Sequence, residues 1–478
     1  MQKKQLTILP VVLLLTLTGC VNLAPDYERP AAPVESAWPQ GEAYATTEAK
    51  RAALPVWKDF IVDERLEKVI DLGLENNRDL RVAALNVERA RALYGVQRSE
   101  LFPTVAAAAQ NAAQHTPETL SATGRSSTGH QYTAQLAMSS YELDFFGRVR
   151  NLNEQALQNY LASDDARRSA KSTLIGQIAM TWLTYGADVE QLKLQRETLA
   201  SQEESFRLVE ESFRLGAVSQ LDYEQARTTV AAARASIAAY QRAVAVDRNA
   251  LQLLVGAPIP EELLPTGIEL ASTLKVALPE GMPSEVLLNR PDVQQAERSL
   301  RAANASIGVA RAAFFPSVSL SLGGGTGSLH LSDLFGGNSG MWSFTPNVAL
   351  PIFTGGRNLA NLEAARVDER IAATNYEKAI QTAFREVADA LATEGTIEGE
   401  LKSREEYADA AGKAYEISNS RYQHGAAAYT EVLDAQRAKV SAEQVLITTQ
   451  LARASSLVTL YKVLGGGALE EPAKQGID

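Results

Sequence analysis

The sequence has 478 residues and a formal net charge of −11, with 46 Lys and Arg against 57 Asp and Glu. An acidic chain without basic clusters is not typical of a nucleic-acid-binding protein. Cys20 is the only cysteine, which excludes an intrachain disulfide and a thiol-rich metal site. Hydrophobic residues make up 45% of the chain but aromatic residues only 6%, which suits close-packed helices better than a bulky core.

The N-terminus has the pattern of a lipoprotein signal. Lys3 and Lys4 precede the apolar run from Leu6 to Thr18, which is too short to span a membrane as a helix. The run ends in Leu17-Thr18-Gly19-Cys20, which resembles a bacterial lipobox, where the signal is cut before a cysteine that is then lipidated. The alternative is an ordinary signal peptide with a chance cysteine. Because Val21 rather than an Asp follows, resemblance to sorted lipoproteins favours the outer membrane.

A Pro/Ala-rich linker is expected next, and then a helix and two strands. The helix is expected to end at Phe102-Pro103, because a residue before proline disfavours helical backbone angles. Thr104 to Gln114, weakly, and His130 to Leu143, clearly, alternate apolar with small or polar residues, which predicts two strands. The polar loop from Thr116 to Gly129 would join them.

The stretch from Gly147 to Gly256 predicts two long antiparallel helices joined by one tight turn. Apolar residues recur at steps of three, four or seven, a period typical of coiled coils. They are Leu174, Ile178, Trp182, Tyr185, Val189, Leu192, Leu199, Phe206 and Phe213 on the first arm and Val230, Ala233, Ile237, Tyr240, Val244, Leu251 and Leu254 on the second, with Asp247 in register. The first arm would span roughly 100 Å, and Gly216 suits the positive φ of a helix end.

The second half of the sequence repeats the pattern of the first half. Arg78 to Pro103 matches Pro291 to Pro316, and further pairs keep the order. The pairs are Asp79/Asp292, Ala90/Ala303, Gly95/Gly308, Arg98/Arg311, Phe102/Phe315, Pro103/Pro316, Gly147/Gly356 and Gly216/Gly425. A period of roughly 210 residues is too long for a solenoid. It indicates a duplicated unit of helix, strand pair, long helix and return helix.

The second unit repeats the strands and the hairpin. Ser317 to Leu322 and Trp342 to Ile352 alternate as strands do, around a polar loop from His330 to Gly340. Gly323 to Ser328 is expected to be strand or loop, because no helix or Gly-Lys-Ser/Thr follows as in a phosphate-binding loop. A long helix from Arg357 and its return complete the unit.

Four short alternating segments with aromatic residues near their ends fit a transmembrane barrel. A soluble antiparallel sheet lying on the helices is the alternative. Four strands cannot close a barrel, and an open edge is not viable in lipid. Closure would therefore require several chains, giving eight strands from two copies or twelve from three.

The ordered set of lipobox, duplicated unit, Phe-Pro turns, Trp57-Lys-Asp-Phe60 and Asp144-Phe-Phe-Gly-Arg148 resembles the TolC-type outer-membrane efflux factors, in their OprM-like (NodT) lipoprotein branch. The resemblance covers nearly all of the mature chain. It implies a mainly α fold with a small membrane β portion, in which four strands per chain contribute to a twelve-stranded barrel shared by a homotrimer. It also implies a helical tunnel across the periplasm.

The resemblance places a periplasmic gate on Arg421 to Asp434. Glu431 and Asp434 share one helix face and would form rings of carboxylates around the bore, although spacing alone favours ordinary solvated charges. Asp222, the repeat equivalent of Glu431, is expected to pair with Tyr422 or Arg421. Relatives often carry a bulky apolar residue where Thr430 stands, and some carry an Arg at Ala427. Either the seal is laxer here, or Tyr422 and Tyr429 make it.

The turns would dock a periplasmic adaptor protein, because small residues permit close approach of another helix. The docking residues are Gly216, Ala217, Val218, Ser219, Gly425 and Ala426. The inner-membrane partner implied is a transporter of the resistance–nodulation–division type. Outer-membrane lipid is the remaining partner, and no cofactor is expected apart from covalent lipid on Cys20.

The predicted divisions are a signal peptide (1–19), a lipidated linker (20–60), helices leading into the strands (61–103), strands (104–146), a long hairpin (147–256), a linker (257–283), the second lead-in helices (284–316), strands (317–353), the second hairpin (354–467) and a tail (468–478).

No catalytic or metal-binding pattern is present. The four histidines lack metal-ligand spacing, and there is no nucleophile elbow. The sequence therefore predicts that the protein is not an enzyme, and the resemblance implies the passive exit duct of a tripartite drug-efflux pump. Two alternatives stay open, which are a duct for type I protein secretion and a lipid-anchored coiled-coil protein without a pore.

Overall fold

The computed structural model describes residues 21–44, 54–268, 273–274 and 284–468. The predicted signal peptide and Cys20 lie outside the described residues, as do most of the predicted linker after residue 268 and residues 469–478. The chain divides into two compact units. One comprises residues 1–31, 86–163 and 295–376, and the other residues 32–85, 164–294 and 377–478.

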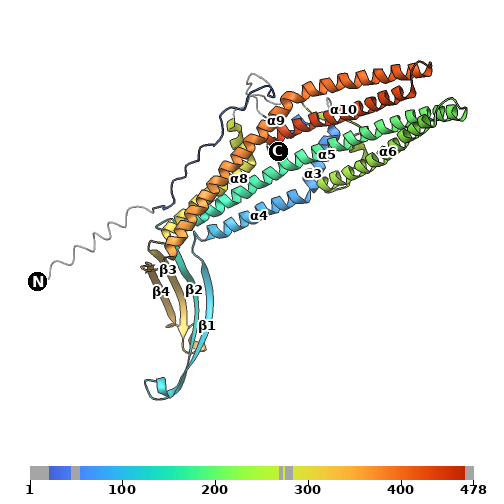
Figure 1. Cartoon of the computed structure of the whole chain (residues 1–478). Coiled ribbons are helices and arrows are strands. Elements are labelled where there is room, and N and C mark those ends of the chain that lie inside the picture. The colour runs from blue at the N-terminus through green and yellow to red at the C-terminus, as the bar shows by residue number, and fades with distance from the viewer. Residues whose placement is uncertain (1–20, 45–53, 269–272, 275–283, 469–478) are drawn as a thin grey trace, which may run out of the picture. The chain divides into compact units, whose positions relative to one another are not determined.

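The helices and strands follow the predicted duplicated order (Figure 1). They are α2 (Trp57–Phe60), α3 (Glu64–Asn76), α4 (Arg78–Ser99), β1 (Val105–Thr116), β2 (Ser127–Leu143), α5 (Arg148–Arg214), α6 (Gln220–Val255), α8 (Pro291–Ala312), β3 (Ser317–Ser328), β4 (Gly340–Ala349), α9 (Arg357–Gln423) and α10 (Tyr429–Val463). Helices α4 and α8 have 22 residues each, and α5 and α9 have 67 each. Equal lengths at equivalent places confirm the duplication.

The four strands form one antiparallel sheet in the order β1-β2-β3-β4 (Figure 1). Strands β2 and β3 come from different repeats and pair from Tyr132 opposite Ser328 to Leu143 opposite Val318, with a bulge between Met138 and Tyr141. Among the described residues, β1 pairs only with β2 and β4 only with β3. Both outer strands therefore have one edge without a partner strand.

Several strand boundaries differ from the sequence pattern by a few residues, and the glycine-rich segment that was expected to be strand or loop is strand. Strand β3 continues through the glycine-rich segment to Ser328, where a Cβ at Gly325 would clash with the carbonyl oxygen of Ala134 on β2. Glycine therefore permits the close approach of these two strands. Strand β4 ends at Ala349 rather than at Ile352, because Pro351 cannot donate to a strand ladder. Pro346 within β4 is tolerated because this strand lies at the edge.

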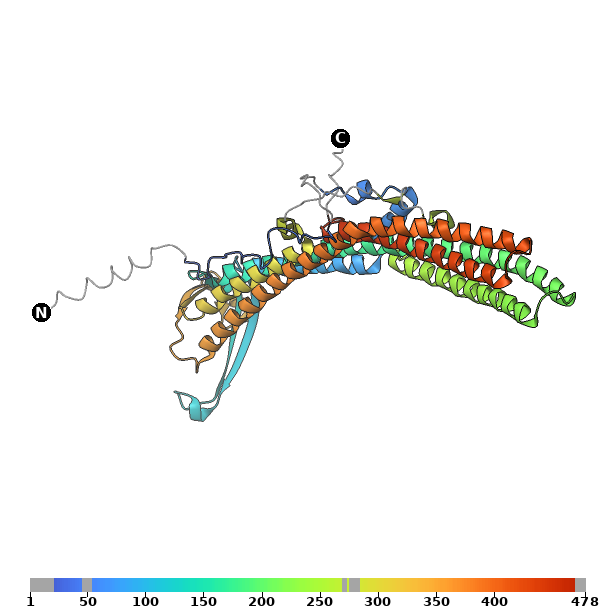
Figure 2. The ribbon, with the colours of Figure 1, turned by 45° about the horizontal axis from the view of Figure 1, so that its top comes forward.

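Two helical hairpins dominate the second unit. Figure 2 shows α5 beside α6 and α9 beside α10, with the two turns at the same end of the unit. No described helix has an 18-residue stretch apolar enough to cross a membrane. The C-terminal part of α6 packs against α3, and that of α10 packs against α2.

The predicted N-terminal linker ends at residue 56, because Trp57–Phe60 forms the short helix α2. Trp57 and Phe60 are each 1% exposed, and the Phe60 ring stacks on that of Tyr461 at 4.1 Å between centroids. The Tyr461 hydroxyl donates a hydrogen bond to the carbonyl of Pro55. These contacts fasten the end of the linker to α10.

Gly256, which follows the last residue of α6, provides a test of the packing. Its φ is 75°, and a Cβ there would lie 2.5 Å from the carbonyl oxygen of Asn76. Gly216, at the turn after α5, has a φ of 74° but open space around it. Alanine costs about 1–2 kcal/mol in this backbone region at either position, and Gly256→Ala adds a steric clash.

We therefore expect Gly256→Ala to lower the Tm of the detergent-purified protein at least twice as much as Gly216→Ala. Circular dichroism on heating gives both values. Equal shifts for the two variants would show that α3 and α6 do not approach as described.

Candidate gate and membrane junction

Both tight turns are closed by the same backbone motif. At the first turn, the amide of Gly216 donates to the carbonyl of Phe213 and the amide of Ala217 to that of Ser212. At the second turn, Gly425 and Ala426 donate in the same way to Tyr422 and Arg421. These paired bonds form a Schellman motif, which places a glycine at positive φ. The predicted docking residues from Gly216 to Ser219 and at Gly425 and Ala426 are thus mostly exposed on two similar turns.

The helices that follow the two turns are capped differently. Ser219 and Asp222 form a reciprocal capping box at the start of α6. Ala428, at the repeat-equivalent position before α10, has no side chain that can cap. Asp222 is therefore occupied by its own helix end, whereas Glu431 is available for another partner.

Within a single chain, the predicted pairing of Asp222 with Arg421 is not formed. The Arg421 guanidinium lies 3.5 Å from a Glu431 carboxylate oxygen and donates to the carbonyl of Ala426 at 3.1 Å. Asp222 acts on Tyr422 only through its charge. The pKa of the Tyr422 phenol is raised, first by burial and then by this nearby carboxylate. The capping box explains the difference, since it takes the carboxylate of Asp222.

The tyrosines near the second turn belong to a core that joins the two hairpins. Tyr429 is 7% exposed and packs with Val209, Ala226, Val432 and Leu433. The Tyr422 ring lies 5.3 Å from that of Tyr429. Burial raises the pKa of Tyr429 to about 12. In the single chain these rings hold the turns together rather than facing solvent.

The predicted gate carboxylates face solvent. Glu431 and Asp434 side chains are 50% and 78% exposed, and Thr430 is exposed beside them. Asp434 has only a long contact, 3.6 Å, with Arg437 one turn along. The structure therefore brings Arg421, Glu431 and Asp434 onto one accessible surface of the second turn and α10.

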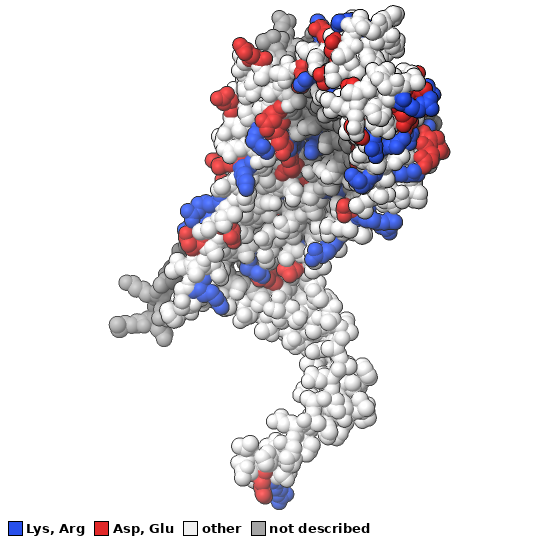
Figure 3. Space-filling model, turned by 45° about the vertical axis from the view of Figure 1, so that its right-hand side comes forward, with Lys and Arg blue, Asp and Glu red and all other residues white. Residues whose placement is uncertain are grey.

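The sheet carries almost no charge. Glu142, near the end of β2, is the only Asp, Glu, Lys or Arg in the four described strands. In Figure 3 the strands form a white extension whose charged atoms gather at the far loop. Large apolar side chains are exposed on it, including Trp342 at 81%, Val348 at 65% and Leu136 at 61%. This surface suits lipid and not water.

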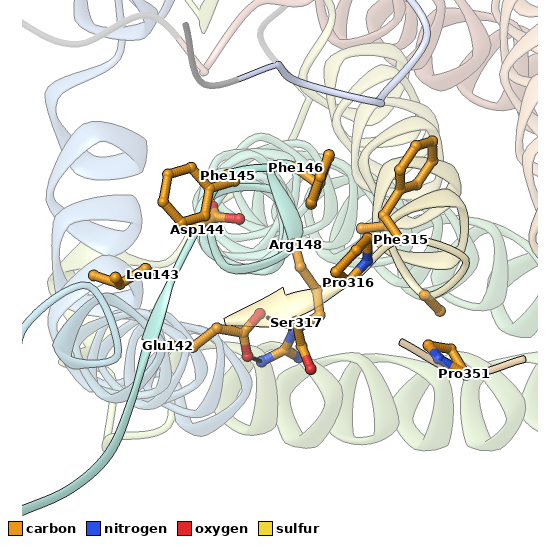
Figure 4. A pocket seen from close by; sticks show the side chains of 12 residues that line it. Glu142, Leu143, Asp144, Phe145, Phe146, Arg148, Phe315, Pro316, Ser317 and Pro351 are labelled. Carbon is orange, nitrogen blue, oxygen red and sulfur yellow. Dashed lines mark hydrogen bonds and ion pairs between the residues drawn. The ribbon is translucent and has the colours of Figure 1, made fainter. Parts of the chain in front are cut away.

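A pocket of about 150 Å³ lies where the strands meet the helices (Figure 4). Its apolar lining includes Phe145, Phe146 and Phe315, and the rings of Phe146 and Phe315 stack at 4.8 Å. On its polar side the Arg148 guanidinium binds both carboxylate oxygens of Glu142, at 2.8 and 2.5 Å. We call this the junction pocket.

An N-terminal strap, residues 21–31, runs along the first unit. The Val21 amide donates to the carbonyl of Phe145, and Arg311 and Asn304 of α8 donate to the carbonyls of Leu23 and Pro25. A Cβ at Gly308 would clash with the side chains of Asn151 and Ala24. The strap is therefore fitted closely to α8.

Glu297 of α8 fixes the far end of the strap. Its carboxylate receives hydrogen bonds from Arg29 at 2.9 Å and Arg301 at 2.8 Å, and Arg301 lies over the Tyr27 ring. Burial alone would raise the pKa of Glu297, but the two guanidinium groups outweigh it and lower that pKa. Sequence reasoning missed this group, although the Glu297–Arg301 spacing of four residues was visible.

A second missed feature is a carboxyl pair between α5 and α6. Burial, together with a hydrogen bond to Asp247, raises the pKa of Asp188 to about 6. One oxygen of Asp247 is buried and has no protein hydrogen-bond partner. The pKa of Tyr240 is also raised, by burial and then by the Asp188 charge. Asp247 was found in register with the apolar residues, but its partner was not predicted.

No group of three or more His, Asp or Glu side chains in the described ranges is arranged to hold a metal ion.

Comparison with known proteins gives the family. The model of the outer membrane efflux protein family matches residues 69–257 and 282–466. The chain belongs to the outer membrane efflux protein family.

Individual relatives agree with this assignment. The chain is 46% identical over 462 residues to the solvent efflux pump outer membrane protein SrpC of Pseudomonas putida, covering 96% of this chain and 98% of that protein. It is 42% identical to the outer membrane protein OprJ of Pseudomonas aeruginosa, covering 98% and 97%. The open-state crystal structure of the Neisseria gonorrhoeae MtrE outer membrane channel superimposes with a TM-score of 0.85 at 38% identity, covering 94% and 98%.

The family assignment confirms the predicted resemblance, the TolC-like fold and the outer-membrane location. The chain is an outer-membrane efflux channel that extends into the periplasm, and it is not an enzyme. The alternative of a coiled-coil protein without a pore is therefore excluded. The gate and docking residues stay predictions.

The carboxyl pair predicts a pH-dependent stability. A carboxyl group with a folded-state pKa raised to about 6 favours folding below its unfolded value near 3.8, and this contribution is lost as pH rises through 6. Solvent near the half-exposed pair reduces the effect to about 1 kcal/mol. We expect Asp247→Asn to raise the Tm by about 2–4 °C at pH 7.5, and by much less at pH 4.

Thermal unfolding at both pH values checks this expectation. Glu211→Gln, which removes an exposed carboxylate paired with Arg214, is the matched control and should shift the Tm little at either pH. A gain from Asp247→Asn that is equal at pH 4 and pH 7.5 would contradict the shared proton.

Proposed function

We propose that three copies of this chain form the exit duct of a tripartite multidrug efflux pump. Each copy supplies four strands to a twelve-stranded outer-membrane barrel and two helical hairpins to a periplasmic tunnel. Cys20 carries a lipid anchor. A periplasmic adaptor docks on the turns, and an inner-membrane transporter of the resistance–nodulation–division type supplies the energy, so the duct itself is passive.

The observation that carries the proposal is a sheet that has one charged side chain, Glu142, and two open edges. The outer edges of β1 and β4 present backbone groups without partner strands. In hydrocarbon, unpaired backbone groups cost several kcal/mol each. Joining β4 of one copy to β1 of the next removes both edges, and three copies complete the closure.

The names of the relatives support the substrate class. Close relatives are described as a solvent efflux pump protein, a toluene efflux pump protein and an antibiotic efflux pump protein. We infer that this duct likewise passes apolar organic compounds and antibiotics. Export of a protein by a type I secretion system is the competing outcome of the test below.

The surface at the second turn supports a charged gate. Arg421, Glu431 and Asp434 are exposed and only loosely paired. In a trimer, three copies of Glu431 and Asp434 would surround the bore, attracting cations and repelling anions. Opening would replace such polar links with contacts to the adaptor.

A polar groove between the hairpins supports movement as the way the gate opens. It holds about 360 Å³ and is lined by amide and hydroxyl side chains of α5, α6 and α10. Gln195 is 3% exposed, and its side-chain nitrogen has no protein partner; Gln202 has an unpaired oxygen in the same groove. The groove leaves contacts between α10 and α5 unmade and these two amide groups unsatisfied, so α10 can shift against α5 at lower cost.

Conductance in planar bilayers tests the gate. We expect the purified wild-type protein to give a small conductance and the Glu431→Gln/Asp434→Asn double variant a conductance at least threefold larger with weaker cation selectivity. Glu416→Gln, an exposed change elsewhere on α9, is the control and should behave as wild type. A protein that forms no channel in either form would overturn the duct itself.

Susceptibility of a deletion strain tests the substrate class. Loss of the gene should lower the inhibitory concentration of apolar antibiotics and solvents at least fourfold, while secretion of exported proteins continues. The reverse pattern would assign the duct to protein secretion.

A further inference from the structure

Helices α5 and α8 pack against each other within one chain. The rings of Phe146, just before α5, and Phe315, just after α8, stack at 4.8 Å in the junction pocket. Further along the helices, a Cβ at Gly308 of α8 would clash with the side-chain nitrogen of Asn151 of α5. Glycine therefore permits the close approach of these two helices.

Both helices bury a row of side chains on the side of this contact. Steps of three, four or seven residues return to one side of a helix. The buried residues that lie at such steps along the rows of Gly308 and Asn151 are Ala302, Ala305 and Ala312 on α8, and Gln158 and Ala162 on α5.

The repeat equivalents of α8 and α5 are α4 and α9, and there the same rows are exposed. All 22 residues of α4 belong to the described part of the chain, and none of them is buried. Gly95, the equivalent of Gly308, has open space where Gly308 meets Asn151. The other exposed equivalents are Arg89, Ala92 and Ser99 on α4, and Ala360, Val367 and Ile371 on α9.

Apolar side chains lie on these uncovered sides. Val96 is 65% exposed in the same row of α4, and Ile371 is 54% exposed on α9. Val367 stands where α5 has the buried Gln158, so the exposed row is the more apolar of the two. Exposed apolar rows of this kind are typical of a surface that another chain covers.

The order of the strands shows which helix can cover each row. Helix α5 follows β2 and α8 leads into β3, and these two inner strands pair within the chain (Figure 1). Helix α4 leads into β1 and α9 follows β4, which are the two outer strands. Pairing of β4 of one copy with β1 of the next, as proposed above, therefore brings α9 of the first copy beside α4 of the second.

We propose that α9 of each copy docks on α4 of the next copy, in the arrangement that α5 and α8 show within one chain. The partner is a second copy of this chain, and the inference rests on the association of copies in the proposed function. The repeat gives the register, because Ala360 of one copy then lies beside Gly95 of its neighbour, as Asn151 lies beside Gly308. Each copy supplies one half of this contact to each of two neighbours.

Disulfide cross-linking in native outer membranes tests the register with the full-length protein. We expect Gly95→Cys/Ala360→Cys, oxidised with copper phenanthroline, to run as covalent dimers and trimers on a non-reducing denaturing gel. Each single variant shows the background from Cys20, the only native cysteine. Gly95→Cys/Asn361→Cys, in which the second cysteine is moved by one residue to another side of α9, should cross-link at least fivefold less, because disulfide geometry is narrow.

Two substitutions test the contact without cross-linking. Ala92→Trp places a large side chain on the uncovered side of α4, where a single chain leaves room for it. It should lower the trimeric share of the protein in mild detergent at least fivefold, as measured by light scattering. Arg91→Trp, the neighbouring exposed residue on another side of α4, should leave that share unchanged. Equal circular dichroism of the two variants separates lost association from lost folding.

The outcomes separate this contact from the association itself. Wild-type protein that stays a single copy would overturn the proposed function together with the contact. Trimers in which Gly95→Cys/Ala360→Cys cross-links no better than Gly95→Cys/Asn361→Cys would overturn the contact and leave the trimer. A disulfide that closes without a gain in mass would also overturn it, since α4 and α9 of the same copy would then meet.

Discussion

The constraint on which the structure depends is the unpaired edge of its sheet. Four strands with a single charged side chain among them bury apolar area only if lipid covers them, yet lipid leaves the backbone groups of β1 and β4 without partners. A single chain cannot meet both requirements. Association of copies around a closed barrel meets them together, and the same association brings the hairpins into one tunnel.

The two repeats have the same order of helices and strands, but they differ in the cap after the turn and in the contact with the N-terminal strap. Ser219 caps α6 and engages Asp222, whereas Ala428 leaves Glu431 free to reach Arg421. Gly308 lies under the strap, whereas its equivalent Gly95 does not. Duplication therefore supplied two equal scaffolds, and small substitutions gave one turn an accessible carboxylate surface and one helix an anchoring surface.

Much of the fold could be predicted from the sequence because apolar residues recur with regular spacing and the whole unit is repeated. The 3.5-residue period gave the hairpins, alternation gave the strands, and the repeat gave their number. Boundaries set by tertiary contacts were not predictable, as the helical Trp57–Phe60 shows. The exposed Glu431 and Asp434 were found through the family resemblance. The ion pair of Glu297 with Arg29 and the carboxyl pair of Asp188 with Asp247 were missed. Their members lie far apart in sequence, and no local pattern marks such partners.

The number of copies in the membrane-extracted protein tests the central claim most directly. The full-length lipidated chain is extracted in mild detergent, and its protein mass is measured by light scattering with the detergent contribution subtracted. A mass of three chains is expected at all concentrations that preserve the helical spectrum. A well-folded single copy, stable without detergent or companions, would contradict the account.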